Sequence, residues 1–320
     1  MELAVTVLLF AAGAALVIKG GDLFVDAASW IAERSGIPKL IVGATIVSLA
    51  TTMPEMLVSV MAAVQGKVDM SIGNAVGSVT ANLGLIMALA LICMPGTIRR
   101  SDYLLKTVLM LAAAALIAAC GVAGAVPLPV SLMLIAVFAV FLWENIRGAR
   151  KSAVLRQQEP GSRSPLSRKT ALLYGLKFAA GAAGIIVGAQ LLVDNGSELA
   201  RLAGIPERVI GITLVAVGTS LPELITTVTA IVKKQSALSV GNILGANIMD
   251  LALIMPLSSL LSGQALPISP AFAFVDLPVC LLIGLLAMVP ALIRSRFSRW
   301  QGILLLAVYG SYVLFTCIAV

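Results

Sequence analysis

Two stretches of the chain repeat each other: GATIVSLATTMPE at residues 43–55 and GITLVAVGTSLPE at residues 211–223. Six of the thirteen positions are identical, and the second stretch begins 168 positions after the first. The same offset aligns SIGNAVGS at residues 71–78 with SVGNILGA at residues 239–246. Each copy of the first motif places a proline and a glutamate inside an apolar segment. A carboxylate is costly there, so its repetition predicts one functional site built from two halves.

The composition is that of a membrane protein. Of the 320 residues, 60% are hydrophobic and 12% are charged, and the mean hydropathy is +1.05. About a quarter of the residues of a soluble domain are charged. The first apolar run follows Glu2 rather than a basic segment, so we interpret it as the first span and not as a removed signal peptide. The net charge of +7 lies mainly in loops, and its expected partner is the anionic surface of the lipid bilayer rather than nucleic acid.

The sequence lacks the histidine residues and cysteine spacings that are typical of many catalytic sites. The chain has no histidine, which removes histidine zinc sites, Ser-His-Asp triads and histidine proton relays. The four cysteines lie in apolar runs without CxxC spacing, so we expect free thiols. We therefore predict that the protein is not an enzyme and uses no cofactor, and the sequence indicates no obligatory protein partner.

Hydropathy predicts ten transmembrane helices, each formed by an apolar stretch of about 20 residues or more. These stretches lie near residues 3–31, 38–65, 70–95, 104–124, 126–146, 171–200, 206–232, 238–262, 270–293 and 300–319.

Positive charge predicts the orientation of these helices. The polar segment Arg147–Lys169 carries seven basic residues and one acidic residue. If this segment is cytoplasmic, 17 basic residues fall on the cytoplasmic side and only Lys67, Arg201 and Arg208 on the other. Because short cytoplasmic loops are enriched in Lys and Arg, we predict a multi-pass protein of the plasma (inner) membrane with a basic cytoplasmic linker at residues 147–170. Both termini then lie outside.

The predicted organisation is two inverted halves. The first five-helix repeat covers residues 1–146 with its core motif at 43–87, and the second covers residues 171–320 with its core motif at 211–255. Because five is odd, the second half crosses the membrane in the opposite direction. The predicted fold class is an all-α polytopic membrane protein of ten transmembrane helices in two inverted five-helix repeats, with broken helices at the midplane. Such repeats are common in transporters, whose ion sites lie where the halves meet.

Each Pro-Glu turn exposes a backbone carbonyl. Proline has no N–H, so Pro54 frees the carbonyl of Ala50 and Pro222 frees that of Gly218. Inside a membrane such a group needs protein, water or a bound cation as its partner.

Hydroxyl groups surround the two glutamates. Thr51 precedes Glu55 by four residues and Thr219 precedes Glu223 by four, so each hydroxyl shares a helix face with a carboxylate. Thr52 and Ser220 add further hydroxyls. Such clusters of hard oxygen atoms suit Ca²⁺ or Na⁺ and do not suit soft metals.

The second pair of motifs differs between the copies. Ser78 and Asn82 are spaced i, i+4, and the 168-residue offset places Ala246 and Asp250 at the equivalent positions. Because a buried charge costs roughly 2.5–3.5 kcal/mol even on the lenient insertion scale, we predict functional roles for Glu55, Glu223 and Asp250. We interpret Asn74, Asn242 and the motif glycines as helix-packing residues, and Asp22, Asp26 and Asp194 as structural charges near span ends.

The motifs Gly-x-Thr…Thr-(Ser/Thr)-x-Pro-Glu and Gly-Asn-x-x-Gly-(Ser/Ala)-x-x-x-(Asn/Asp) resemble the α-repeats of the sodium/calcium exchanger (cation/Ca²⁺ exchanger, CaCA) superfamily. The resemblance covers the whole chain, and its compact size is similar to the prokaryotic branch. It implies a secondary antiporter in which spans one and six slide over the rest, with four cation positions at the centre. In that arrangement Glu55 and Glu223 would bind Ca²⁺ with Thr51 and Thr219. Sodium would use these carboxylates with Thr52, Ser220, Ser78 and the backbone carbonyls of Ser48 and Ala216, while Asn82 and Asp250 complete the middle.

Three positions depart from the family pattern. Ala50 stands where the family usually has glycine, and Thr52 replaces a serine. Ala246 replaces a serine that otherwise contributes a hydroxyl ligand, which removes one sodium ligand. The coupling ion is therefore open between Na⁺ and the alternatives, a Ca²⁺/H⁺ or K⁺-assisted antiporter.

We predict exchange of Ca²⁺ for Na⁺ by alternating access at a shared midplane carboxylate site. Two glutamates neutralise one Ca²⁺ or two Na⁺, and ions that use the same oxygens compete. Two other classes of membrane protein fit the sequence less well. A cation channel usually builds a continuous pore by oligomeric symmetry. An intramembrane aspartyl protease needs two catalytic aspartates, and the faint motif Gly20-Gly21-Asp22 has no matching second motif.

Overall fold

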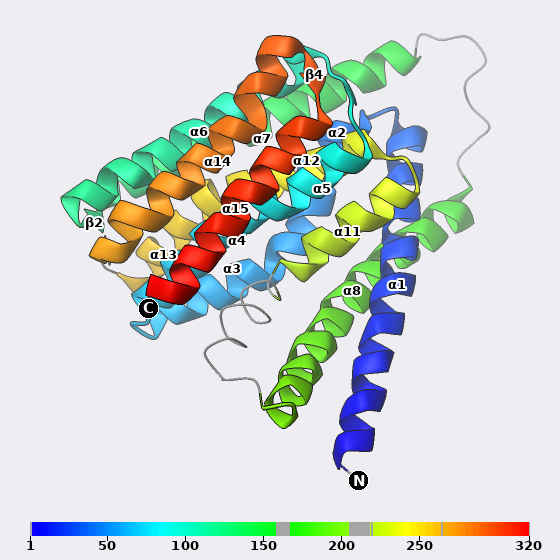
Figure 1. The fold of residues 1–320 in the computed structure, drawn as a ribbon. Helices are drawn as coiled ribbons and strands as arrows, with labels where there is room; N and C mark the ends of the chain where they lie inside the picture. Colours follow the sequence, from blue (N-terminus) through cyan, green and yellow to red (C-terminus); the bar gives the residue numbers. More distant parts are fainter. Residues whose placement is uncertain (1, 158–166, 205–217, 219, 264, 320) are drawn as a thin grey trace. The chain divides into compact units, whose positions relative to one another are not determined.

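The computed structural model describes residues 2–157, 167–204, 218, 220–263 and 265–319. Within these residues the chain is helical except for short turns and four two-residue strands (Figure 1). The helices are α1 (Glu2–Ser35), α2 (Lys39–Val42), α3 (Ser48–Val64), α4 (Val68–Ala81), α5 (Ala88–Cys93), α6 (Arg100–Ala123), α7 (Leu128–Gln157), α8 (Arg168–Leu202), α11 (Leu221–Val232), α12 (Ser236–Met249), α13 (Met255–Ser262), α14 (Leu277–Arg294) and α15 (Arg299–Ala319). Four π-helical segments are η1 (Gly43–Val47), η2 (Asn82–Met87), η4 (Asp250–Ile254) and η5 (Phe272–Asp276). The strands are β1 (Gly96–Thr97), β2 (Ala125–Val126), β3 (Leu266–Pro267) and β4 (Arg296–Phe297).

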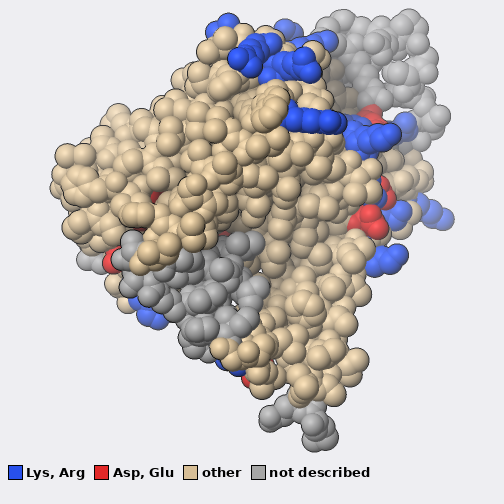
Figure 2. All heavy atoms as spheres, in the orientation of Figure 1, with Lys and Arg blue, Asp and Glu red and all other residues tan. Residues whose placement is uncertain are grey.

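These elements group into the ten helical spans that hydropathy predicts. Eight helices of the described chain are long and apolar enough to cross a membrane, from Leu3–Ser35 to Phe272–Arg294. The seventh span is described only as the shorter α11, because residues 205–217 and 219 lie outside the described part. Uncharged residues cover most of the helix walls in Figure 2, and the basic side chains gather near helix ends. The side chains of Cys93, Cys120 and Cys280 are free thiols, as expected.

The predicted linker is partly helical. α7 continues to Gln157 instead of ending near residue 146, and α8 begins at Arg168. The segment from Arg147 onward is rich in Arg, Ala, Lys, Leu and Gln, which are strong helix formers. The polar extension of α7 therefore follows from helix propensity, which hydropathy does not measure.

The chain forms two compact units, which we describe one at a time. The first unit contains Met1–Thr51 and Trp143–Asn242, and the second contains Thr52–Leu142 and Ile243–Val320. Each unit takes segments from both halves of the sequence. The compact units and the sequence repeats are therefore different divisions of the chain.

In the first unit, α1 and α8 lie side by side and their backbones touch at glycines (Figure 1). A Cβ atom built on Gly20 would lie 2.9 Å from the carbonyl oxygen of Gly181, and one built on Gly13 would lie 3.0 Å from that of Gly188. The two helices are therefore antiparallel. The 168-residue offset maps Gly13 onto Gly181 and Gly20 onto Gly188, so each contact is the repeat mate of the other. An inverted repeat predicts this reciprocal pattern.

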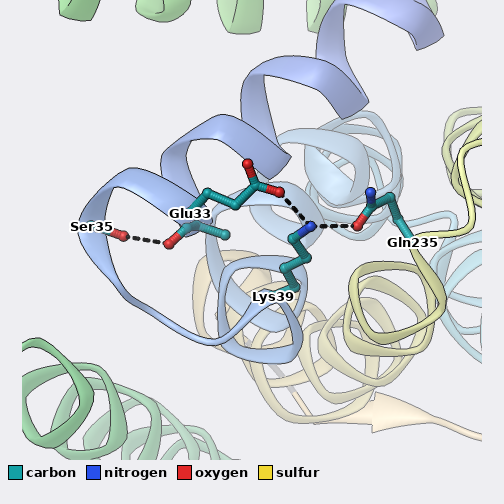
Figure 3. Close-up of polar contacts among 5 residues, drawn as sticks. Glu33, Ser35, Lys39 and Gln235 are labelled. Carbon is teal, nitrogen blue, oxygen red and sulfur yellow. Dashed lines mark hydrogen bonds and ion pairs between the residues drawn. The ribbon is translucent and has the colours of Figure 1, made fainter. Parts of the chain in front are cut away.

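The turn between α11 and α12 is bonded to α1 and α2 by two lysines. Lys39 Nζ donates to Glu33 Oε1 and to Gln235 Oε1, both at 2.7 Å (Figure 3). Lys233 Nζ lies 2.7 Å from Asp26 Oδ1 and 3.3 Å from Asp22 Oδ1. Burial alone would lower the pKa of Lys233, but its hydrogen bonds to Asp26 and Asp22 raise that pKa above the ordinary value.

In the second unit, two antiparallel ribbons connect helix ends. β1 pairs with β4 and β2 pairs with β3. The 168-residue offset relates β1 to β3 and β2 to β4 to within three residues, so the ribbons are repeat mates. β1 precedes α6 and β2 follows it, which places the ribbons at opposite ends of this helix.

The glycine contact predicts that Gly20→Val destabilises the protein. The added side chain must displace the backbone of α8, and overpacking of this kind costs about 1–3 kcal/mol. Thermal unfolding of the purified protein in detergent measures the loss. Gly175→Val on α8 is the matched control, because no other atom lies within 4 Å of a Cβ built there. Equal unfolding temperatures for the two variants would contradict the close approach.

The ion pair of Lys233 predicts a small contribution to stability that depends on pH. Because the folded protein raises the lysine pKa, the contribution is complete below the ordinary pKa of 10.5 and disappears as the pH rises through the raised value. Lys233→Gln introduces the residue that stands at the equivalent position of the first repeat, Gln65. We expect a stability difference below about 1 kcal/mol at pH 7, measured as a shift in unfolding temperature, because exposed pairs are screened. The difference should vanish well above pH 10.5, and a difference that persists there would disprove the role of the charge.

Candidate cation site

The first Pro-Glu turn lies inside a continuous helix. α3 contains Pro54, and the irregular backbone lies upstream in η1, where the chain is π-helical. Without an N–H on Pro54, the carbonyl of Ala50 lacks its usual helical donor. Glu55 follows directly and is only 1% exposed.

The second Pro-Glu turn starts a helix. Ser220 is the N-cap of α11, and Pro222 and Glu223 lie in the first turn. Glu223 is also 1% exposed. The peptide dipoles at a helix N-terminus favour a negative charge, so Glu223 gains a stabilisation that Glu55, inside α3, does not have. The two copies therefore hold the same carboxylate in different electrostatic surroundings.

Asn82 and Asp250 each begin a π-helical segment, η2 and η4. These positions correspond at the 168-residue offset, so the irregularity is itself repeated. Single π-turns inside α-helices often mark functional sites. Both side chains are buried in the second unit, where α4 packs against η4.

Several buried oxygens near the motifs have no hydrogen-bond partner among the described residues. They are Ser78 Oγ, Asn82 Oδ1 and Ser220 Oγ. A buried polar group without a partner is costly, so each such oxygen calls for an explanation. A bound cation satisfies hard oxygen atoms, and these residues fit that role.

Three asparagines contribute more than the sequence predicts. Asn74 Nδ2 donates to the carbonyl oxygen of Glu55 at 3.1 Å and to Ser59 Oγ at 2.9 Å. Asn242 Oδ1 lies 3.2 Å from the hydroxyl of Thr51, which also lies 3.3 Å from the Ser48 carbonyl. These two repeat mates therefore hold neighbouring turns of α3, where we had expected only helix packing.

The third asparagine, Asn247, accepts a hydrogen bond from Asn82 Nδ2 at 3.1 Å. Its own Nδ2 lies 3.8 Å from Met110 Sδ. The repeat of Asn74 and Asn242 was visible in the sequence. Asn247 aligns with Val79, so no repeat signal could have identified it.

The predicted ligands divide between the two units. The first unit holds Ser48, Thr51, Ser220 and Glu223, and the second holds Thr52, Glu55, Ser78, Asn82 and Asp250. All nine are buried. Thr219 and Ala216 lie outside the described residues. Within the described chain, no three acidic or cysteine side chains gather as a metal-binding group.

Comparisons with known proteins give the family. The family model described as sodium/calcium exchanger protein matches residues 5–146 and 174–318. The chain is 32% identical over 301 residues to an uncharacterized membrane protein of Methanocaldococcus jannaschii, with 94% of each chain covered. It is 28% identical over 369 residues to the sodium/calcium exchanger MaX1 of Methanosarcina acetivorans, with 97% of each covered.

Solved structures agree with these relatives. A structure of the sodium-calcium exchanger NCX_Mj soaked with Na⁺ and Sr²⁺ superposes with a TM-score of 0.82 at 28% identity, covering 98% of this chain and 99% of the other. This match confirms the predicted ten-helix fold of two inverted repeats. Members of the family are secondary transporters and not enzymes. The chain therefore belongs to the sodium/calcium exchanger family, in its prokaryotic branch, and is a cation antiporter of that type.

Proposed function

We propose that this antiporter exchanges Ca²⁺ for Na⁺ by alternating access at one shared site that includes Glu55 and Glu223. The observation that carries the proposal is the pair of repeated Pro-Glu carboxylates, each 1% exposed inside apolar helices. Packing has no use for two buried charges, each of which is costly in a membrane. The unpartnered oxygens of Ser78, Asn82 and Ser220 support the same conclusion.

The proposed ligands follow from the chemistry of each side chain. Ca²⁺ prefers several oxygen ligands with flexible geometry, which carboxylates, hydroxyls and freed carbonyls supply together. In this proposal Glu55 and Glu223 bind Ca²⁺ with Thr51 and Thr219. Na⁺ binds to the same carboxylates with Thr52, Ser220, Ser78 and the carbonyls of Ser48 and Ala216, and Asn82 and Asp250 lie between the ions.

Competition for charge explains why such a site would exchange ions. Two glutamates are neutralised by one Ca²⁺ or by two Na⁺, so the two loads satisfy the same carboxylates and exclude each other. A carrier that changes conformation only when these charges are balanced moves one load inward for each load moved outward. Exchange then follows from electrostatics without an energy source other than the two ion gradients.

The proposed membrane arrangement completes the mechanism. Residues 1–146 and 171–320 form the inverted repeats, the 147–170 linker lies in the cytoplasm of a plasma (inner) membrane protein, and both termini lie outside. The glycine contacts bring the backbones of α1 and α8 close together, which suits a pair of helices that moves as one body.

Loss of either carboxylate should abolish exchange. Glu55→Gln or Glu223→Gln keeps the side-chain size but removes a charge that balances the cation. In proteoliposomes, radioactive calcium uptake driven by an outward Na⁺ gradient should fall by at least about 100-fold, the effect of some 2.7 kcal/mol. Glu198→Gln is the matched control, because Glu198 is a half-exposed residue of α8 that is paired with Arg201.

The same assay separates the possible coupling ions. Full activity in both site variants would contradict the shared site. Wild-type calcium uptake that does not depend on Na⁺ but is driven by a pH gradient would show that H⁺ is the coupling ion. The protein would then be a Ca²⁺/H⁺ antiporter. Ala246 favours this second candidate, because it is buried at the position equivalent to Ser78 and offers no side-chain oxygen.

Restoring the missing hydroxyl should strengthen the sodium dependence. Ala246→Ser adds one oxygen where the first repeat has Ser78. A gain of about 1 kcal/mol from one added polar contact lowers the half-saturating Na⁺ concentration for calcium exchange about fivefold. Ser78→Ala is the reciprocal variant and should raise that concentration. No response to Na⁺ in either variant would place these two positions outside the sodium sites.

A further inference from the structure

The β1–β4 ribbon gathers five arginines from two distant parts of the sequence. In its register Gly96 faces Phe297 and Thr97 faces Arg296, and Ile98 N donates to Ser295 O at 2.9 Å. This pairing fixes the α5–α6 and α14–α15 turns to each other within the second unit. The arginines of the two turns are Arg99, Arg100, Arg294, Arg296 and Arg299. Figure 2 shows basic side chains at the end of this unit where Figure 1 places β4.

The five guanidinium groups are exposed, and the described residues supply them with no hydrogen bond or ion pair. The nearest acidic residue in the sequence, Asp102, accepts a hydrogen bond from Ser101 at 3.1 Å. The ribbon therefore carries a strong excess of positive charge that the described part of the chain does not neutralise.

Helix stability does not explain three of these arginines. Arg99 is the N-cap of α6, Arg100 is its first residue, and Arg299 is the first residue of α15. The positive end of a helix dipole lies there, and cations near it are unfavourable by a few tenths to about 1 kcal/mol. Three of the five arginines thus add to a positive potential instead of offsetting a negative one.

The mate of this ribbon provides an internal comparison. The β2–β3 ribbon has the same backbone pairing at the other end of α6, and residues 123–129 and 263–271 around it include no charged residue. The ribbon geometry itself therefore needs no arginine. Of the two related ribbons, only the β1–β4 ribbon carries this cluster of positive charge.

Exposed apolar side chains border the arginines. Ile293 is 72% exposed and Trp300 is 78% exposed, and each is next in sequence to a ribbon arginine. Exposed tryptophan beside basic residues is typical of the level where lipid headgroups meet acyl chains. Guanidinium groups bind phosphate oxygens through paired hydrogen bonds. An anionic phospholipid presents its phosphate without the ammonium group that offsets the charge in a zwitterionic headgroup.

We propose that the β1–β4 ribbon is a binding site for the phosphate of an anionic phospholipid headgroup, with Arg99, Arg296 and Arg299 as its main contacts and Trp300 against the acyl chains. The site is independent of the ions that the protein transports. The orientation proposed above assigns this site to the cytoplasmic leaflet, and only that assignment depends on it.

Native mass spectrometry of the full chain in detergent micelles tests the site. Dioleoyl phosphatidylglycerol is added to the wild type, and dioleoyl phosphatidylcholine serves as the zwitterionic comparison. We expect the wild type to retain phosphatidylglycerol preferentially. The triple variant Arg99→Gln/Arg296→Gln/Arg299→Gln should lose about fivefold in affinity for each arginine removed. Phosphatidylcholine retention should not change.

A matched control variant distinguishes a specific lipid site from a general attraction between positive charge and anionic lipid. Arg150→Gln/Arg168→Gln/Lys169→Gln removes the same number of exposed positive charges from α7 and α8 and should bind phosphatidylglycerol as the wild type does. Circular dichroism verifies folding, and the single variant Arg296→Gln gives the same test at smaller amplitude if the triple variant does not fold.

Three outcomes would overturn the proposal. The first is equal loss of phosphatidylglycerol in the ribbon and control variants, which would indicate non-specific charge. The second is unchanged binding in the ribbon variants. The third is displacement of the lipid by millimolar inorganic phosphate, which would assign the arginines to a free anion instead of a bilayer lipid.

Discussion

The cost of holding carboxylates inside apolar helices governs the motif segments of this protein. Glu55, Glu223 and Asp250 are each at most 1% exposed, and each charge in such a place is destabilising unless other groups compensate it. The motif segments are accordingly irregular: a proline inside α3, a helix start at α11, and π-helical turns at Asn82 and Asp250. Pro54 frees the carbonyl of Ala50 from regular helix bonding, whereas the start of α11 leaves backbone N–H groups that favour the carboxylate of Glu223.

Duplication supplies the frame for these motif segments, and small differences distinguish the two copies. The α1–α8 glycine contacts and the two ribbons are reciprocal, as an inverted repeat requires. Other features occur once. Lys233 holds α1 where its mate Gln65 has no charge, and the arginines stand on one ribbon only. These single features give the two copies of the repeat different chemistry.

The sequence predicts the spans well because hydropathy and the 168-residue repeat act over many residues. It indicates candidate site residues because a charge in an apolar run stands out, and their binding of cations stays a prediction. Other features have no such signal. The strands of the ribbons are two residues long, too short to show an alternation of apolar and polar residues. The end of α7 depends on helix propensity. The hydrogen bond between Asn82 and Asn247 joins residues that are distant in the sequence. The division into units that mix both halves also follows from packing, which no local pattern records.

Charge counting links the remaining asymmetry to selectivity. In the proposed site, one Ca²⁺ neutralises Glu55 and Glu223, and Asn82 in the first copy adds no charge. Its mate Asp250 adds a third carboxyl group in a fully buried position. A net negative charge there is costly in a medium of low dielectric constant, because unscreened charges interact strongly. The calcium-loaded site is therefore neutral only if Asp250 holds a proton or a further monovalent cation. In the same proposal, three Na⁺ would balance all three carboxylates, and the difference between Asn82 and Asp250 would set how many monovalent ions accompany or replace one Ca²⁺.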